Sequence, residues 1–163
     1  RDKLVTGVQT CALPILTDGE KSMTSFFGLF RKKVDDVLEH ASCPVAIFVN
    51  RDYRNGDEVA VLINGSMDSF LFTYVRRLLE DGGSFIHLYY FSSGSEEYVG
   101  QIYKINKQYA NRVHLYPLVE IEDLVLPIIH GLLILSYDTC VGIAANEKVF
   151  KALPSLLVMK DAS

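Results

Sequence analysis

The chain has 163 residues, of which 49% are hydrophobic and 22% are charged, and its formal net charge is −4 at pH 7. This is the composition of an ordinary globular domain, or of one domain and part of another, and it excludes a low-complexity or fibrous chain. The excess of acid argues against a nucleic-acid partner, which would need a clustered basic face. The dense basic cluster at residues 31–33 is followed at once by acids and is interpreted as a solvated helix face.

Residues 1–16 differ in character from everything that follows. They show neither helical nor strand periodicity, and residues 4–16 carry no charge. The stretch at residues 5–15, VTGVQTCALPI, is the codon-by-codon translation of a common sequencing-adapter text. A signal peptide is the competing interpretation, but its apolar stretch would contain Gln9 and Pro14. We therefore interpret residues 1–16 as a non-native leader that packs poorly, and expect the native protein to continue upstream.

Cysteine usage and hydropathy limit the setting of the protein. Outside the leader, Cys43 and Cys140 have neither the spacing of zinc ligands nor that of a disulfide framework. A reducing, cytosolic setting is therefore the default. The longest apolar run, residues 124–135, is too short to span a bilayer and contains Pro127 and Gly131. We expect no transmembrane segment in the chain.

Hydrophobic periodicity predicts an alternation of strands and helices. In chain order it predicts a helix over 27–40, a strand over 44–49, a connector over 50–57, a strand over 58–63, a turn over 64–69, a helix over 70–79, a strand over 84–91, a helix over 96–109, a strand over 113–118, a helix over 120–129, a strand over 132–137, a helix over 146–153 and a strand over 155–160. From residue 58 onward, this order predicts a parallel five-stranded sheet with helices on both faces. Before it stands a helix that leads through Cys43-Pro44 into a buried strand, as Leu153-Pro154 leads into the last one, which is a weak internal repeat.

The ordered set of motifs resembles universal stress protein domains. HASCPVAIFV, residues 40–49, is similar to the segment that closes such a domain, and VLINGSMDSFLFTYVRRLL, residues 61–79, is similar to the segment that opens one. This resemblance implies a universal stress protein-like (adenine nucleotide alpha hydrolase-like) fold with strand order 3-2-1-4-5. The pair of units, with the ending LLILSYDT…LPSLLVMKD, more narrowly resembles the cytosolic tail of bacterial cation:proton (sodium/hydrogen) antiporters. In that family, two degenerate stress-protein-like domains follow the membrane portion.

The resemblance implies a domain organisation and a function. Residues 17–54 would be the C-terminal helix and last strand of a first universal stress protein-like domain, and residues 55–163 would be the second. The implied function is that of a non-enzymatic regulatory domain at the cytoplasmic face of the inner membrane. Its partners would be its own membrane transport domain, which exchanges monovalent cations for protons, and the tandem first domain, or a homodimer through the last strands. The alternative is a free-standing stress-protein-like nucleotide-binding protein; a small α/β hydrolase or transferase has no site to support it.

The nucleotide site implied by the resemblance is degenerate in this chain. Stress-protein domains that bind ATP are similar in carrying Gly-x-x-Gly-x9-Gly-Ser/Thr after the fourth strand, where glycines let backbone N–H groups approach phosphates. After Tyr137 this chain has a single glycine, Gly142. Asn64, Gly65 and Ser66 stand at nucleotide-site positions, either as a turn with a helix N-cap or as a surviving ligand contact. No cofactor is expected; ATP or another nucleotide is the one to test for at this turn.

Other candidate chemistry is weaker, and we expect no enzyme and no metal site. A Ser-His-Asp set of Ser66, His130 and Asp138 lacks the Gly-x-Ser-x-Gly elbow. Cys43 precedes a proline and a buried strand, which is typical of an inert core thiol. The histidines have no paired ligand spacing; they are His40, His87, His114 and His130.

The two closing strands carry the sharpest structural expectation. Residues 45–49 and 156–160 are short, aliphatic and preceded by proline. A lone apolar strand exposes backbone N–H and C=O groups that seek a partner. We therefore expect antiparallel backbone pairing between these two strands, with the apolar stripe of the helix over 27–40 packed on the second unit.

Overall fold

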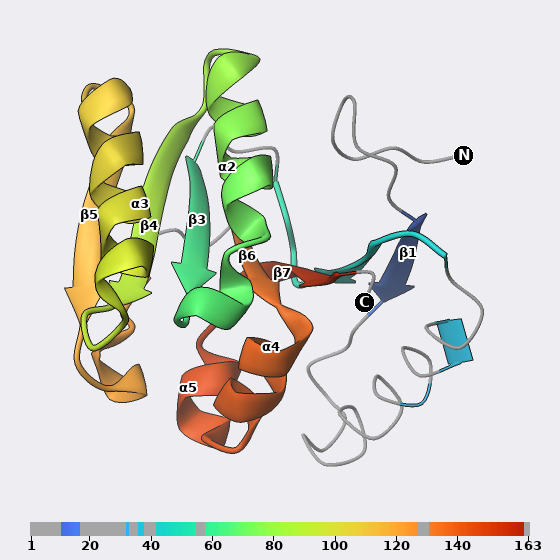
Figure 1. Ribbon diagram of the computed structural model, residues 1–163. Helices are drawn as coiled ribbons and strands as arrows, with labels where there is room; N and C mark the ends of the chain where they lie inside the picture. The colour runs from blue at the N-terminus through green and yellow to red at the C-terminus, as the bar shows by residue number, and fades with distance from the viewer. Residues whose placement is uncertain are drawn as a thin grey trace.

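The structure is a computed structural model that describes residues 11–16, 32, 36–37, 42–54, 58–126 and 131–161. These residues form an α/β fold around one seven-stranded sheet, with the spatial order β1-β2-β7-β6-β3-β4-β5 (Figure 1). The predicted α/β class is thereby confirmed. None of the described helices is long and apolar enough to cross a membrane.

From residue 45 onward the elements follow one another in the expected alternation, with an additional helix at residues 137–144 that the periodicity did not predict. The strands are β1 (Cys11–Leu16), β2 (Val45–Asn50), β3 (Glu58–Ile63), β4 (Phe85–Phe91), β5 (Val113–Leu118), β6 (Leu132–Ser136) and β7 (Ser155–Lys160). The helices are α2 (Leu71–Glu80), α3 (Glu96–Gln108), α4 (Tyr137–Ala144) and α5 (Glu147–Lys151), with 3-10 turns η1 (Ser66–Asp68) and η2 (Ile121–Asp123). Among the described strands, β2 and β7 pair antiparallel and every other neighbouring pair is parallel.

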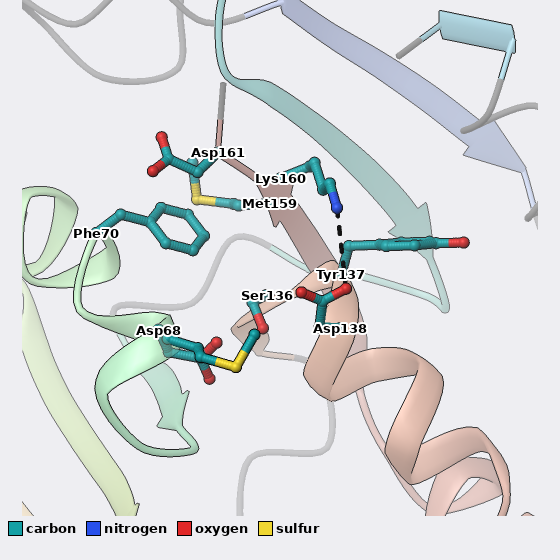
Figure 2. A pocket seen from close by; sticks show the side chains of 9 residues that line it. Asp68, Phe70, Ser136, Tyr137, Asp138, Met159, Lys160 and Asp161 are labelled. Carbon is teal, nitrogen blue, oxygen red and sulfur yellow. Dashed lines mark ion pairs between the residues drawn. The ribbon is translucent and has the colours of Figure 1, made fainter. Parts of the chain in front are cut away.

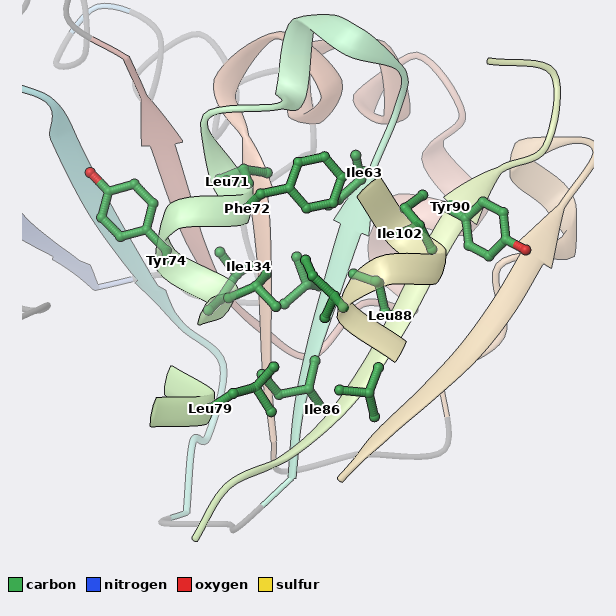
Figure 3. Packing of buried hydrophobic residues seen from close by; sticks show 14 of the residues in the cluster. Ile63, Leu71, Phe72, Tyr74, Leu79, Ile86, Leu88, Tyr90, Ile102 and Ile134 are labelled. Atoms are coloured by element: carbon green, nitrogen blue, oxygen red, sulfur yellow. The ribbon is translucent and has the colours of Figure 1, made fainter. Parts of the chain in front are cut away.

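Helices cover both faces of the sheet, because its central strands are apolar on both sides. In β3, Val61 and Ile63 point toward α2 and α3, whereas Ala60 and Leu62 belong to the cluster that packs against α4 and α5. Figure 3 shows the first of these clusters, in which the side chains of α2 and α3 lie on the sheet; the labelled members include Leu71, Phe72, Ile102, Ile63 and Leu88. Because both faces are buried, the central strands β3 and β6 are held in place, and so are the loops that follow their carboxyl ends at Ile63 and Ser136.

The expected pairing of the two closing strands is confirmed. Val45 lies opposite Lys160 and Val49 opposite Leu156, so β2 and β7 run antiparallel over five residue pairs. Of the helix expected over residues 27–40, the structure describes Lys32, Asp36 and Val37 as helical, and Val37 packs against the cluster on the α4 and α5 face. The rest of that helix lies outside the described residues.

The expectation that residues 1–16 pack poorly is wrong for the backbone of six of them. Residues 11–16 form β1, which pairs with β2 in parallel from Cys11 opposite Val45 to Leu16 opposite Asn50. The physical reason lies in β2, whose outer edge would otherwise present unpaired backbone groups to any uncharged extended segment nearby. That this segment originates from translated adapter sequence stays a prediction. Residues 1–10 lie outside the described residues.

Two further elements differ from the sequence-based expectation. Of the helix expected over 120–129, the structure describes residues 120–126, and these contain only the turn η2, because Leu124 has already left the helical region with ψ 99°. Pro127 disfavours a helical residue before it. Tyr137 was expected to end a strand but begins α4, since the hydroxyl of Ser136 caps that helix by accepting a hydrogen bond from the N–H of Thr139. Helix α5 begins after Asn146 as expected.

Candidate functional site

The candidate site lies at the carboxyl ends of β3, β6 and β7. Strands β3 and β6 are parallel neighbours, yet the chain leaves β3 for α2 on one face and β6 for α4 on the other. Ligands of open α/β sheets bind in the crevice that such a divergence creates. A cavity of about 130 Å³ occupies this crevice (Figure 2). Its lining comprises Met67, Asp68, Phe70, Ser136, Tyr137, Asp138, Met159, Lys160 and Asp161.

Asp68 forms the floor of the site and joins two loops. Its side chain is buried, with a relative exposure of 2%. Its Oδ2 accepts a hydrogen bond from the backbone N–H of Asn64 at 2.8 Å and another from the hydroxyl of Thr139 at 2.8 Å. Thr139 lies in the first turn of α4, where the positive end of the helix dipole favours a negative group. The negative charge of the Asp68 carboxylate therefore lies near the first turn of α4, the position at which a helix would otherwise stabilise a bound phosphate.

The mouth of the cavity carries a loose ion pair. The Nζ of Lys160 lies 3.9 Å from the carboxylate of Asp138 and 5.5 Å from the centroid of the Tyr137 ring. Both charged groups are solvent-accessible, so this pair contributes little to stability. With Asp68 and Asp161, the lining holds three carboxylates and one ammonium group. This excess of negative charge disfavours the binding of a polyanion such as a nucleoside triphosphate.

No protein-family model matches the chain, and no curated protein matches its sequence. The geometry and charge of the site are therefore the grounds on which its function is inferred.

The sequence-predicted site residues lie beside the cavity and not in its lining. Asn64 follows β3 with its side chain exposed, and it turns its backbone N–H toward Asp68. Gly65 adopts φ 91°, the left-handed region that glycine favours, and Ser66 begins η1. As expected of a turn with a helix N-cap, Gly65 is the N-cap of η1, but no side chain makes a capping hydrogen bond at the start of η1 or of α2.

Tyr98 holds the end of β3 in place for the site. Its hydroxyl donates a 2.8 Å hydrogen bond to the carbonyl of Ile63, the last residue of β3, and its ring packs over Gly94. Burial, above all, raises the pKa of the Tyr98 hydroxyl to about 12, so it stays a neutral donor. Helical periodicity over residues 96–109 gives no sign of this long-range bond.

His87 and His114 lie on adjacent strands, away from the cavity. Nδ1 of His87 is 3.0 Å from the hydroxyl of Tyr116, and Nε2 is 3.8 Å from the carboxylate of Glu58. Burial lowers the pKa of His87, which outweighs the opposing influence of Glu58. The exposed ring of His114 stacks on Phe85 at 4.8 Å. These contacts are those of packed strand histidines.

Nucleophilic and metal chemistry find no support in the described part of the chain. No three His, Cys, Asp or Glu side chains among those residues are grouped to hold a metal ion. Cys140 is buried, and this burial raises the pKa of its thiol to about 12, so it is not a nucleophile at neutral pH. Cys43 is a free, half-buried thiol. Of the Ser-His-Asp set, Ser66 begins η1 and Asp138 lines the cavity mouth, whereas His130, like His40, lies outside the described residues.

Proposed function

We propose that the chain is a non-enzymatic regulatory module, part of the cytosolic tail of a membrane cation:proton antiporter. It combines the end of a first universal stress protein-like unit with a second unit that begins at β3. Two features support this proposal beyond the resemblance of the motifs. The strands of the second unit stand in the spatial order third, second, first, fourth, fifth, and its fifth strand is the one that meets the first unit. Transport would take place in a membrane part, which this module would bias from the cytoplasmic face.

The observation that carries the proposal is the junction between the two units. Beyond the β2–β7 ladder, the backbone N–H of Arg51 donates to the hydroxyl of Ser155 at 2.7 Å. The guanidinium Nη1 of Arg51 donates to the carbonyls of Phe150 at 2.8 Å and Leu153 at 3.1 Å. A regulatory tail shifts a transporter between states through an interaction free energy that differs between those states, and contacts that join the parts of the tail can transmit this interaction from one part to the other. This junction provides such coupling.

The site supports regulation through protein contacts more than through a nucleotide. Cavities that hold small molecules of drug or cofactor size occupy roughly 300–1,000 Å³, whereas this one has about 130 Å³. The carboxylate of Asp68 stands at the first turn of α4, where it repels a second anion. A scaffold whose nucleotide site has been replaced by internal hydrogen bonds accounts for both features.

The test begins with the gene from which the chain comes. We expect the coding sequence upstream of residue 17 to specify a series of hydrophobic helices of about 20 residues each. Cation-driven proton movement is then measured in membrane vesicles that carry the complete protein, with and without residues 55–163. Removal is expected to change the pH or cation dependence of exchange. An upstream sequence without membrane-spanning helices would refute the proposal.

One observation favours the alternative of a free-standing nucleotide-binding protein. The cavity lies where the helices that follow β3 and β6 diverge to opposite faces, which is the usual ligand position in open α/β sheets. A saturable ATP complex would decide for that alternative.

A further inference from the structure

The lining of the cavity changes from charged to apolar and back to charged between its floor and its mouth. The buried carboxylate of Asp68 forms the floor, and the exposed carboxylates of Asp138 and Asp161 stand at the mouth. The half-buried ring of Phe70 and the buried thioether of Met159 complete the wall, and Figure 2 shows both between Asp68 and Asp161. The complement of such a lining is a molecule with a cationic group at each end and an apolar chain between them.

One oxygen of the Asp68 carboxylate has no donor in the described part of the chain. The hydrogen bonds from the N–H of Asn64 and the hydroxyl of Thr139 both end on Oδ2, and Oδ1 accepts none from the described residues. A buried ionised carboxylate is costly unless it is paired and fully hydrogen-bonded. A cationic group bound in the cavity would supply both the missing donor and the opposite charge.

The hydroxyl of Ser136 offers a second acceptor at the floor. Thr139 links it to Asp68, because the Thr139 N–H donates to Oγ of Ser136 at 3.1 Å while the Thr139 hydroxyl donates to Asp68. Ser136 also lines the cavity, and its hydroxyl oxygen can accept a further hydrogen bond. A primary ammonium group carries three donors and can bind a carboxylate and a hydroxyl oxygen together, whereas a quaternary ammonium group has no donor. The floor therefore favours a primary ammonium group.

Charge and volume limit the ligand further. Three carboxylates against the single ammonium group of Lys160 leave the lining with a formal excess of two negative charges, which a dication would neutralise. Because a cavity of about 150 Å³ holds a molecule the size of benzene, the 130 Å³ here admit about six non-hydrogen atoms. A metal cation suits the cavity less well, since it needs several ligands at once and the described residues contain no group of acidic, histidine or cysteine side chains that could hold one.

We propose that the cavity binds a short aliphatic diamine in its doubly protonated form. One ammonium group lies at Asp68 and Ser136, and the other lies at the mouth with Asp138 and Asp161. Lys160 already places an ammonium group 3.9 Å from Asp138, so it competes with the ligand for this carboxylate. That the diamine is a signal sensed by the module rests on the regulatory function proposed above, whereas the site itself rests on the lining of the cavity.

The test is isothermal titration calorimetry of the whole chain with 1,4-diaminobutane at pH 7 and low ionic strength, where exposed charges are least screened. We expect saturable binding of one molecule per chain with a Kd of about 1 mM or lower, the range open to a ligand of about six non-hydrogen atoms. Butylamine lacks the second charge and is expected to bind about tenfold more weakly or less tightly still. The uncharged 1-butanol is expected not to bind.

Variants separate the loss of a ligand contact from damage to the fold. Asp68→Asn keeps an acceptor for Asn64 and Thr139 and is expected to abolish binding. Lys160→Met removes the competing ammonium group and is expected to tighten binding about threefold or more, which damage to the fold would not do. Glu147→Gln removes an exposed carboxylate outside the lining and should leave the Kd unchanged.

Nuclear magnetic resonance of isotopically labelled protein locates the ligand. We expect 1,4-diaminobutane to shift the amide signals of Asn64 and Thr139, and potassium chloride at the same ionic strength to leave them in place. Absence of saturable binding, a Kd for butylamine equal to that for the diamine, equal shifts with potassium ion, or binding that Asp68→Asn leaves intact would each overturn the inference. A diamine complex together with an upstream gene that encodes no membrane helices would leave the site standing and refute the antiporter proposal alone.

Discussion

The guanidinium of Arg51 contacts Phe150 in two ways at once. Its Nη1 donates to the Phe150 carbonyl at 2.8 Å, and its central carbon lies 4.8 Å from the centroid of the Phe150 ring. Phe150 is 1% exposed and lies in the last turn of α5, where carbonyl groups without helical partners favour a positive charge. A side chain that follows β2 thereby caps the C-terminal end of α5.

This contact predicts a stability effect that a surface arginine would not have. Arg51→Ala is expected to lower the free energy of unfolding by about 1–3 kcal/mol, because the Phe150 and Leu153 carbonyls lose a charged donor. Arg54→Ala is the matched control, since Arg54 and Asp52 form a pair that is more than half exposed, and its effect should stay within about 0.5 kcal/mol. Urea unfolding of both variants measures the difference. Equal midpoints would show that the junction does not depend on Arg51.

A second prediction concerns Gly94. A Cβ at this position would collide with the ring of Tyr98, which cannot retreat without breaking its hydrogen bond to Ile63. We expect Gly94→Ala to destabilise the protein by about 1–3 kcal/mol through overpacking. Gly100→Ala, inside α3 where a Cβ meets open space, should instead stabilise by about 0.5–1 kcal/mol. Thermal unfolding of the pair tests this; a melting temperature unchanged by Gly94→Ala would contradict the placement of Tyr98.

The third prediction is a pH dependence at His87. Because burial lowers its pKa in the folded protein, the unfolded chain binds the proton more readily below the ordinary value of about 6.5. The stability contributed by neutral His87 is therefore present above pH about 6.5 and is lost as the pH falls through the lowered folded value. His87→Gln should flatten the dependence of unfolding free energy on pH in this window. His114→Gln, on the exposed neighbour whose charge also lowers the pKa of His87 but less than burial does, is the comparison and should flatten the dependence less. An equal flattening by both variants would argue against burial as the main cause.

Comparison of sequence and structure shows which information is local. The pairing of residues 45–49 with 156–160 could be predicted, because a short apolar strand leaves backbone N–H and C=O groups that need a partner strand. The cap at Ser136 was missed because Tyr137 continued an apolar run. The bond of Asp68 to the α4 side of the site had no local signal, since Thr139 is 71 residues away; its other partner, the N–H of Asn64, is only four residues away. Strand β1 was missed because the pairing that stabilises it comes from β2 and not from its own sequence.

The fourth prediction addresses the candidate site. Equilibrium dialysis against ATP at millimolar concentration is expected to show no saturable binding, because the cavity is small and Asp68 already supplies the anion at α4. Asp68→Asn removes this charge, and Asp138→Asn removes an exposed one at the mouth as a control. Saturable binding by the unmodified chain that Asn64→Ala abolishes would overturn the scaffold interpretation and favour the nucleotide-binding alternative.

The most direct test of the account is the orientation of β2 against β7 in solution. In an antiparallel ladder, the pairs Ile47–Val158 and Phe48–Leu157 bring backbone protons of the two strands close together. We predict interstrand nuclear Overhauser contacts at these pairs in isotopically labelled protein, at full intensity in the unmodified chain and weakened by Arg51→Ala. Contacts in parallel register, or no contact between residues 45–49 and 156–160, would contradict the two-unit junction on which the proposed function rests.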